Sequence, residues 1–460
     1  MRYRSQRIAY AYFAVALFLY GLQLAFGMLS AAKYLGPDPL IDILPFDVTK
    51  AIHTNLLIVW VLTGFMGAAY YVVPEESRTE IYSPRLAYWQ LGIWTVNGVV
   101  AVVGYMFGWT EGNKLLEQPV PVKITIVIVM LMFLYNIFRT MMKGGRWTTT
   151  ENVLVAGLGL AALLYLPALL QFHNYTVSIF YRWWTIHLWV EGVWEMVQAG
   201  LLAYLLIRLS GADREMLEKW LYVIVGLVFI AGIIGTAHHY YWVGVPQYWL
   251  PLGGIFSARV QLALFAMAMW AYFAMRRSGF SHPNKLAIHW TVGSAIYTAF
   301  GAGLLGLAHT WPSVNKWTHG TLITPMHGHS AFFGAYVMVV LAVVTYAMPH
   351  LTRDGDEGRE STLGYWAFWL QAAGMLGMTM AFATAGIAQT YLERIMGLGY
   401  LETQLKIQVH FLMLIGAATV FSVGAACFIW DFFRQRPIEL FGGPGPEVDA
   451  DRPAPEAVLT

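Results

Sequence analysis

Residues 185–195 read Thr185-Ile-His-Leu-Trp-Val-Glu-Gly-Val-Trp-Glu195, and they place three ionisable side chains inside an apolar run. On a helix, His187, Glu191 and Glu195 are spaced i, i+4 and i+8, so they share one face. Ionisable groups at membrane depth are rare, usually face the interior of the helix bundle and mark a functional site. The stretch therefore predicts a membrane helix that turns an imidazole and two carboxylates into one internal space.

The composition is that of a membrane protein. Of the 460 residues, 58% are hydrophobic and 12% are charged, against about 25% charged in soluble domains. The 19 Trp, 26 Tyr and 26 Phe fit aromatic belts at two membrane interfaces. A formal net charge of +2 gives no indication of nucleic-acid binding. The single cysteine, Cys427, excludes an internal disulfide, a cysteine-ligated iron–sulfur cluster and a covalent c-type haem, which needs C-x-x-C-H.

Twelve apolar runs are long enough to cross roughly 30 Å of hydrocarbon. They begin near Ile8, Ala51, Leu86, Val122, Asn152, Trp183, Leu221, Ser257, Leu286, Thr321, Leu363 and Thr403. The first run is too long for a signal-peptide core and is expected to be a span. The predicted fold is an all-α membrane protein, a bundle of twelve transmembrane helices over residues 1–436. The Pro-, Gly- and acid-rich residues 437–460 predict a disordered tail.

The basic residues predict the orientation of the bundle. Arg2, Arg4 and Arg7 place the N-terminus in the cytoplasm by the positive-inside rule. Every second loop is then cytoplasmic, and those loops carry clusters such as Arg139 to Arg146 and Arg208 to Lys219. With twelve spans, the C-terminus and its tail are also expected to be cytoplasmic. This topology brings histidines of four helices to one depth in the outer part of the membrane: His53, His187, His238, His239, His327 and His329.

Three of these histidines and the nearby Glu191 suit a metal. His238 and His239 lie about 100° apart around a helix, so both can approach one ion. His187 supplies a third imidazole, and Glu191 adds a carboxylate one turn away. A mixed imidazole–carboxylate set suits non-haem iron, whereas copper is satisfied by three imidazoles. An interfacial polar pair at a helix end would explain His238 and His239 but not the other two residues at the same depth.

The segment His327-Gly-His329 is the second strong signal. Residues two apart on a helix point some 200° apart, so these histidines are expected to serve two metals on opposite sides of the helix. One can be an axial ligand facing the three-histidine metal. The other needs a partner across a second haem, and His53 is the histidine left at that depth. Axial histidine ligation is ordinary for haem iron.

The remaining seven histidines are expected to be solvated or structural, because most fall in loops or at interfaces. They are His173, His282, His289, His309, His319, His350 and His410. The small residues of 301–306 are expected to allow close helix packing.

The pattern resembles the haem–copper oxidase superfamily, and within it the large catalytic subunits of cytochrome c-dependent nitric oxide reductases. The resemblance covers nearly the whole chain. The motifs that carry it are Lys50-Ala-Ile-His53-Thr-Asn, His187-Leu-Trp-Val-Glu191-Gly-Val-Trp-Glu195, Gly235-Thr-Ala-His-His-Tyr-Tyr-Trp242, and Asn315-Lys-Trp-Thr-His-Gly320 followed by His327-Gly-His329.

The resemblance implies a role for each of these residues. It implies that His53 and His329 hold a low-spin haem b and that His327 holds the high-spin haem b3. It implies a non-haem iron on four ligands: His187, His238, His239 and Glu191. Glu195 is implied as a carboxylate that affects proton delivery. Lys50, one turn before the first histidine, is either a partner of a haem propionate or an interfacial lysine.

Glu191 also separates a reductase from an oxidase. Oxidases of the superfamily carry a tyrosine four residues after the first metal histidine, as a source of an electron and a proton for splitting O2. A carboxylate binds iron but cannot do the redox work of the tyrosine, so coupling of two NO to N2O is favoured. The inner half of the membrane shows few ionisable residues, so protons and electrons are expected from outside, without proton pumping.

The electron donor and the membrane follow from the resemblance. The chain has neither a C-x-x-C-H nor a dicopper cysteine motif, so electrons must come through a partner, which the family supplies as a membrane-anchored cytochrome c subunit. The implied location is the bacterial cytoplasmic (inner) membrane, with the active site toward the periplasm and a role in denitrifying respiration.

Two segments depart from the family pattern. The loop motif G-R-E-Y-x-E reads Gly112-Asn-Lys-Leu-Leu-Glu117 here, with Lys114 where a calcium-binding glutamate is usual. A lysine has donors and no acceptor, so we expect Lys114, held by Glu117, to replace calcium as the positive charge beside the propionates. The alternative is that Lys114 points into water. The family's S-A-L-E-P reads Ser257-Ala-Arg-Val-Gln261, so Val260 replaces a glutamate near the active site.

Two other functions stay open at this point. One is an O2-reducing relative with copper or iron at the non-haem site, which the absent glutamate at Val260 keeps under consideration. The other is a transporter or channel that uses the same polar residues as a permeation path, and it predicts no haem.

Overall fold

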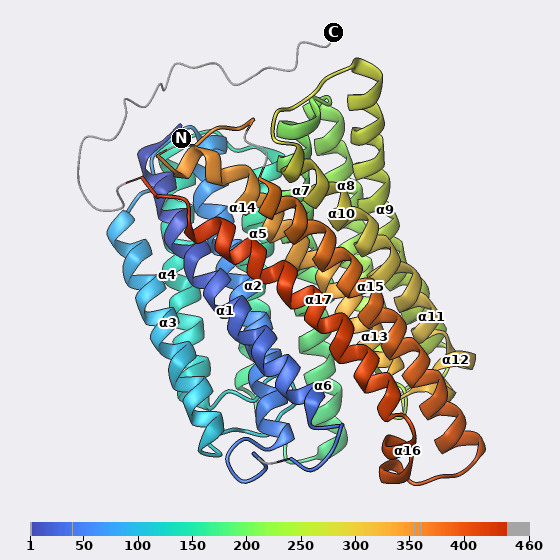
Figure 1. Cartoon of the computed structure of the whole chain (residues 1–460). Helices are drawn as coiled ribbons and strands as arrows, with labels where there is room; N and C mark the ends of the chain where they lie inside the picture. The colour runs from blue at the N-terminus through green and yellow to red at the C-terminus, as the bar shows by residue number, and fades with distance from the viewer. Residues whose placement is uncertain (1, 39, 354, 359–360, 439–460) are drawn as a thin grey trace.

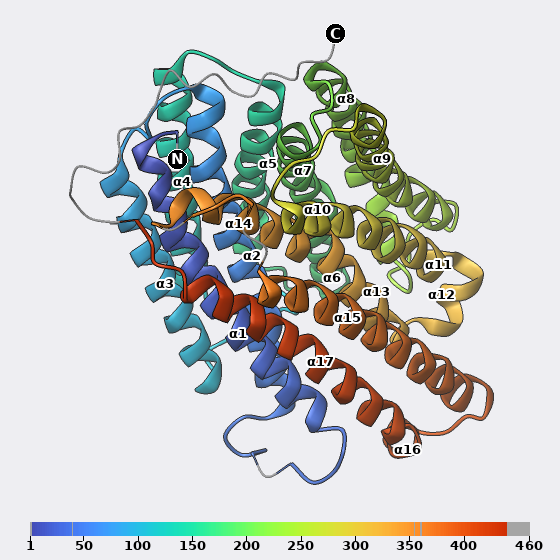
Figure 2. The ribbon, with the colours of Figure 1, turned by 45° about the horizontal axis from the view of Figure 1, so that its top comes forward.

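The computed structural model describes the whole chain except residues 1, 39, 354, 359–360 and 439–460. Within the described residues the chain forms helices and no β-strand, and twelve helices are long and apolar enough to cross a membrane. They stand side by side as one bundle (Figures 1 and 2). The predicted twelve-helix bundle is confirmed. The spans near Trp183, Leu221 and Ser257 begin earlier than their apolar runs, at Tyr175, Arg214 and Trp249.

The elements of the spans have the following bounds. They are η1 (Arg4–Arg7) with α1 (Ile8–Ala32), α2 (Phe46–Ser77), α3 (Pro84–Met106), α4 (Val120–Gly144), α5 (Thr149–Tyr165) with η2 (Leu166–Leu169), α6 (Tyr175–Leu188), η3 (Trp189–Val193) and α7 (Trp194–Ser210), α8 (Arg214–Ile230), η4 (Ala231–Gly235) and η5 (Thr236–His239), α9 (Trp249–Ser278), α10 (Lys285–Tyr297), η6 (Thr298–Leu305) and α11 (Gly306–Thr310), α13 (Ile323–Phe332), η7 (Phe333–Val337) and α14 (Met338–Leu351), α15 (Thr362–Thr390) with η8 (Tyr391–Ile395), and α17 (Gln408–Phe433). Two short helices, α12 (Pro312–Thr318) and α16 (Tyr400–Lys406), lie in the connections.

Local sequence signals begin and end several of these helices. The side chains of Ser83, Thr148 and Asp213 accept hydrogen bonds from the first turns of α3, α5 and α8, which satisfies backbone donors that have no helical partner. Gly145 and Gly211 follow α4 and α7 with positive φ values of 68° and 64°, the left-handed conformation that glycine adopts without strain.

Five of the short elements are π-helical, and four of them lie beside the predicted site. Glu191 lies within η3, η4 precedes the adjacent histidines, η6 packs on α13, and η7 follows the His327/His329 pair. A π-helix adds a residue to one turn and is frequent at functional sites. The added residue rotates the rest of the helix, so the ideal i, i+4, i+8 face predicted for residues 187–195 is interrupted after His187.

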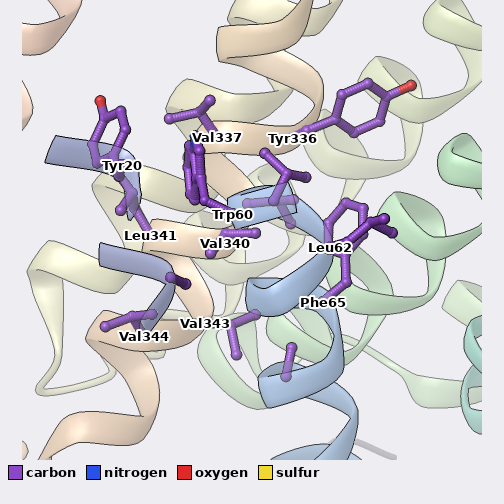
Figure 3. Close-up of a cluster of buried hydrophobic side chains, with 14 of the residues drawn as sticks. Tyr20, Trp60, Leu62, Phe65, Tyr336, Val337, Val340, Leu341, Val343 and Val344 are labelled. Atoms are coloured by element: carbon purple, nitrogen blue, oxygen red, sulfur yellow. The ribbon is translucent and has the colours of Figure 1, made fainter. Parts of the chain in front are cut away.

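An apolar layer fills the middle of the bundle (Figure 3). Trp60 and Phe65 of α2 are fully buried and pack toward η7 and α14, where the side chains from Val337 to Val344 are buried as well. Gly64 lets these two helices approach, because a Cβ there would lie 2.6 Å from the side chain of Val340. The layer separates the two polar ends of the bundle.

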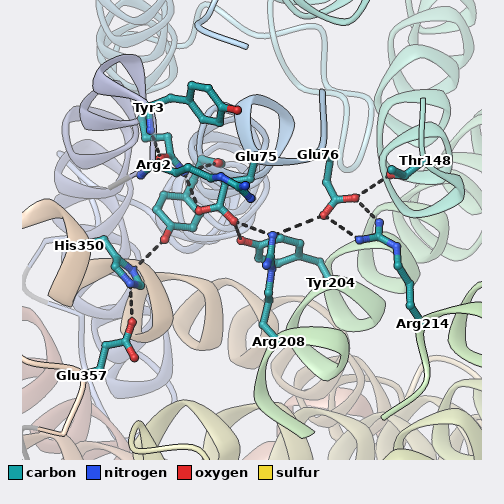
Figure 4. Close-up of polar contacts among 12 residues, drawn as sticks. Arg2, Tyr3, Glu75, Glu76, Thr148, Tyr204, Arg208, Arg214, His350 and Glu357 are labelled. Atoms are coloured by element: carbon teal, nitrogen blue, oxygen red, sulfur yellow. Dashed lines mark hydrogen bonds and ion pairs between the residues drawn. The ribbon is translucent and has the colours of Figure 1, made fainter. Parts of the chain in front are cut away.

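A cluster of paired charges closes the end opposite the six histidines (Figure 4). Arg208 lies 3.0 Å from Glu75 and 3.8 Å from Glu76, and Glu76 also pairs with Arg214. Tyr204 donates to Glu75 over 2.7 Å. These charges stand in the last turns of α2 and α7 and the first turn of α8, at the ends of the spans. The charges neutralise one another, as buried charges must.

The start of α1 and the end of α17 lie at the same end of the bundle, where Tyr10 stacks on Phe432 with ring centroids 4.9 Å apart (Figure 1). Of the predicted tail, Pro437 bridges to Thr352, and Ile438 donates its backbone N–H to Leu351 over 3.0 Å. Residues 439–460 lie outside the described part of the chain.

Candidate metal centre

Four predicted ligands meet in one group. Ligand atoms of His187, Glu191, His238 and His239 all lie within 4.8 Å of one another. The Glu191 carboxylate is 3.5 Å from Nε2 of His187, 3.4 Å from Nε2 of His238 and 3.1 Å from Nε2 of His239. Three imidazole nitrogens converge on one carboxylate, which is the arrangement expected of ligands around a single ion.

Neighbouring side chains hold these ligands in orientation. Thr236 contacts Nδ1 of His187 at 2.9 Å, which leaves Nε2 directed at the group. Ser257 donates to Glu191 over 3.0 Å. Trp183 stacks on His239 with ring centroids 4.7 Å apart and planes 7° apart. Such outer contacts fix the ring orientation and tautomer of metal-binding histidines.

The group fits a metal better than it fits a closed hydrogen-bond network. Nε2 of His187 is buried and has no hydrogen-bond partner among the described residues. Nε2 of His238 and Nε2 of His239 lie 3.0 Å apart, so without a cation only one of these two nitrogens can present a lone pair to the other, and the other must carry the proton. A cation accepts those lone pairs and balances the charge of the Glu191 carboxylate.

His327 faces this group across a small cavity. The cavity has a volume of about 10 Å³ and is lined by Glu191, His238 and His327, together with small residues of α9 and α11. Nδ1 of His327 donates to the carbonyl of Gly301 over 2.9 Å, which leaves Nε2 free as a ligand. The structure thus brings His327 to the side of α13 that the sequence predicts for an axial ligand facing the metal.

His329 lies on the other side of α13 and meets His53. Their ring centroids are 6.2 Å apart and their planes 24° apart. Nδ1 of His53 donates to the carbonyl of Gln23, and Nδ1 of His329 to that of Pro325, each over 2.8 Å. Two metal–imidazole bonds of about 2 Å put axial rings roughly 6 Å apart, so this pair fits opposite faces of one haem iron.

Glu195, the second carboxylate of residues 185–195, lies buried behind the metal group. It accepts a hydrogen bond from the amide of Gln261 on α9. Val260, which stands where the family has a glutamate, is fully buried among apolar side chains of α7, α8 and α9. Gln261, which the sequence reading did not select, is the polar partner of Glu195.

Basic side chains gather beside the loop of residues 107–119. Nζ of Lys114 lies over the ring of Trp183 at 5.8 Å. Removal of this ammonium from water, with Lys50 and Arg182 nearby, lowers the pKa of Lys114 below its usual 10.5, and Glu117 opposes the shift. Glu117 does not hold Lys114 through any hydrogen bond of the described residues; it accepts from Asn55 and from the backbone N–H of Leu115, each over 2.9 Å.

Arg182 is a candidate that sequence reasoning missed. It lies on α6, near enough for its positive charge to lower the pKa of Lys114. Its Nε is buried with no hydrogen-bond partner among the described residues. Three cations on three segments, with Glu117 as the nearby carboxylate, fit an anionic ligand. The signal in the sequence was an arginine one turn before the metal histidine, inside a predicted span.

His309 was expected to be solvated or structural, and the structure buries it at the edge of the site. Its ring lies 6.3 Å from that of His327. Thr318 and Thr324 contact its two ring nitrogens at 3.4 and 3.2 Å. These contacts indicate a structural role for His309 beside the cavity. Its position near the end of a predicted span was the signal in the sequence that it could lie close to the metal group.

Comparisons with known proteins agree on one family. Residues 7–422 match the family described as Cytochrome C and Quinol oxidase polypeptide I. The chain is 41% identical over 456 residues to a subunit of the nitric oxide reductase of Stutzerimonas stutzeri, across 95% of this chain and 96% of that protein. It is 21% identical to a cytochrome c oxidase subunit 1 homolog of Agrobacterium tumefaciens (strain T37), across 84% of this chain and 73% of that protein.

The fold has a counterpart among solved structures. A heme-copper terminal oxidase dimer determined by cryo-EM matches the structure with a TM-score of 0.70 at 13% sequence identity, covering 93% of this chain and 83% of that one. At this identity the match concerns the fold alone.

Proposed function

The chain belongs to the cytochrome c and quinol oxidase polypeptide I family, a haem–copper oxidase family of membrane oxidoreductases, and from that premise we propose that it is the catalytic subunit of a nitric oxide reductase. The reaction takes two NO, two electrons and two protons to one N2O and one water. The relative at 41% identity carries that activity in its name, and the residues of the metal centre support it independently.

The observation that carries the proposal is the carboxylate among the three imidazoles. Glu191 lies within 3.5 Å of a ring nitrogen of each of the three histidines. A carboxylate favours iron over copper at this position. It also brings a negative charge that offsets the charge of the metal in a site where uncompensated charge is costly. A tyrosine at this position would instead offer an electron and a proton for breaking O2.

The residues present fit two b-type haems beside the non-haem iron. His53 and His329 would hold the low-spin haem b, and His327 would hold haem b3 on the side of the cavity opposite the metal group. The Nδ1 atoms of these three histidines donate to backbone carbonyls, so each Nε2 is left as the ligand atom. When bound, the two haems and the iron supply the electrons for reduction and the binding site for NO.

Protons and electrons would enter from the end of the bundle that holds the six histidines. On three core helices no titratable side chain lies between the two polar ends: α2 from His53 to Tyr70, α7 from Glu195 to Tyr204, and η7–α14 from Tyr336 to Tyr346. The stretches of α2 and η7–α14 contribute labelled side chains to the apolar layer in Figure 3. This arrangement supports turnover without proton pumping.

The partner and the membrane are part of the same proposal. A membrane-anchored cytochrome c subunit would deliver electrons to haem b, because the chain has no site of its own for a covalent haem or a dicopper centre. The lipid bilayer would be the bacterial cytoplasmic membrane, with the metal centre toward the periplasm and the clustered charges of Figure 4 toward the cytoplasm.

Lys50, Lys114 and Arg182 would bind the haem propionates in place of calcium. Calcium needs about six to eight oxygen ligands, and at this loop Glu117 offers its carboxylate to Asn55 and to a backbone N–H. The cluster already holds the positive charge that a propionate requires. Trp183 orients Lys114 by a cation–π contact, a role that the sequence assigned to Glu117.

The second candidate, reduction of O2 with copper or iron at the non-haem site, has a specific departure in its favour, the valine at position 260. Metal analysis and the consumption of NO and O2, measured on one preparation of the purified complex, separate the two. Three irons for two haems with NO as the faster substrate support the reductase, whereas one copper beside two irons, or three irons with O2 as the faster substrate, supports the oxidase. A transporter or channel predicts neither, and the absence of haem absorption from folded protein would favour it.

A further inference from the structure

Glu195 and Gln261 form an isolated polar contact inside the membrane bundle. Glu195 is 3% exposed and Gln261 is also 3% exposed. The Gln261 amide donates to Oε1 of Glu195. Oε2 of Glu195 and Oε1 of Gln261 are both buried without a hydrogen-bond partner among the described residues. One oxygen of the carboxyl group is therefore held, and the other is left open.

Packing fixes Gln261 in this position. Gly303 of η6 lies against it, since a Cβ at residue 303 would be 3.2 Å from the Cβ of Gln261. Its neighbour Val260 is buried in the apolar cluster of α7, α8 and α9. Moving the amide away from Glu195 would leave two polar groups unpaired in an apolar interior, at a cost comparable to a lost buried hydrogen bond.

The partner of Glu195 is neutral, which matters for what the carboxyl group can do. A lysine or arginine in place of Gln261 would hold the carboxylate ionised in an ion pair. An amide orients the carboxyl group without fixing its charge, so the group can carry a proton and release it. Proton delivery by a positioned side chain depends on that orientation.

We propose that Gln261 is a positioning residue that orients Glu195 for proton delivery to the metal centre. The proposal rests on the nitric oxide reductase function proposed above. Gln261 holds Oε1, so Oε2 is the atom that exchanges protons. The proton that Oε2 gives up to the metal centre is one of the two consumed for each N2O formed, and it is replaced from solvent.

A buried amide one turn from Glu195 provides a matched control. Gln198 of α7 is fully buried and donates to Thr298 over 3.0 Å, and among the described residues the hydrogen bond to the Glu195 carboxyl group comes from Gln261 and not from Gln198. Gln198→Leu therefore removes the same kind of buried amide from the same region. Gln261→Leu is the test variant, and Gln261→Met, which keeps the length and flexibility of the side chain, serves where the leucine variant does not fold.

The experiment measures NO reduction and the infrared C=O band of the Glu195 carboxyl group in the same holoenzyme preparations. The band is assigned by its loss in Glu195→Gln. Both Gln261 variants should lower kcat about tenfold with KM for NO unchanged, and should move the band to higher frequency because the C=O loses its donor. Gln198→Leu should leave kcat and the band near the wild-type values.

Two results would overturn the proposal: a Gln261 variant with wild-type kcat and an unmoved band, or an equal loss in Gln198→Leu. Wild-type protein that does not reduce NO would count against the proposed function and not against this contact. In that case the infrared band alone decides, and an unmoved band in Gln261→Met refutes the positioning role.

Discussion

The rings of His53 and His329 lie with their centroids 6.2 Å apart, although the two residues are separated by most of the bundle along the chain. They come from α2 and α13, and each ring is oriented by a backbone carbonyl on its Nδ1 atom. Gly27 of α1 makes room for the first ring, since a Cβ there would lie 2.6 Å from it. This arrangement supports the proposal that the two histidines hold one haem iron between their rings.

Replacing either histidine by alanine should remove the low-spin haem signal and leave the high-spin signal in place. The reason is that His327, the proposed ligand of haem b3, has its own carbonyl partner in Gly301 and does not depend on the other pair. Electron paramagnetic resonance and visible spectra measure both signals. His410→Ala, which changes a histidine bonded only to its own helix turn, is the control. Loss of the high-spin signal instead would mean that the two sides of α13 are assigned the wrong way round.

Glu191→Gln should lower NO reduction by on the order of a hundredfold or more, even where iron remains bound. Glutamine keeps the shape of the side chain but removes the charge that offsets the metal. Iron content and NO turnover are measured on one preparation. Ser257→Ala removes only the hydroxyl that donates to Glu191 and should cost less, about tenfold, because the charged carboxylate remains. A glutamine variant with full iron and near wild-type turnover would reduce Glu191 to a packing role.

Lys114→Ala should lower the midpoint potentials of the haems. Removing a positive charge stabilises the oxidised iron, by about 1 kcal/mol or on the order of 40 mV for one electron. Calcium chelators should leave activity unchanged. Lys316, whose ammonium lies 5.3 Å from the ring of Trp317, gives a control lysine with a similar contact. The proposal that Lys114 binds the haem propionates would be contradicted by redox titrations in which Lys114→Ala leaves the haem potentials unchanged. A calcium ion found between the haems would contradict it as well.

Arg208→Met should destabilise the fold without changing the haem spectra. Arg208 pairs with Glu75 and Glu76 in nearly buried surroundings, and removing one partner of a buried ion cluster costs about 3–5 kcal/mol. Thermal unfolding in detergent measures the loss. Lys219→Ala breaks an exposed pair with Glu215 and should have little effect. Equal unfolding temperatures for the two variants would show that the cluster of Figure 4 adds no stability.

Much of this architecture was predictable because a membrane limits the choices. Apolar runs of sufficient length gave the twelve spans, and alternating loop charges put six histidines at one depth. Because residues two apart on a helix point in nearly opposite directions, His327 and His329 could be predicted to lie on opposite sides of one helix. Each inference used a rule that holds without knowledge of the neighbouring helices.

The features that the sequence did not reveal depend on tertiary contacts. The π-helical turns of η3 and η4 have no periodicity signal, yet they set where Glu191 and the adjacent histidines lie. The ion cluster at the other end was missed because its residues sit at span ends, where charges look interfacial. Gln261, His309 and Arg182 became candidates only when their buried partners, or the lack of them, could be seen.

The gas balance of the purified complex, supplied with an electron donor, tests the nitric oxide reductase function directly. Under NO without oxygen, we expect one N2O formed for every two NO consumed, and a slower consumption of O2 when O2 is offered instead. Faster consumption of O2 than of NO, with no N2O produced, would contradict it.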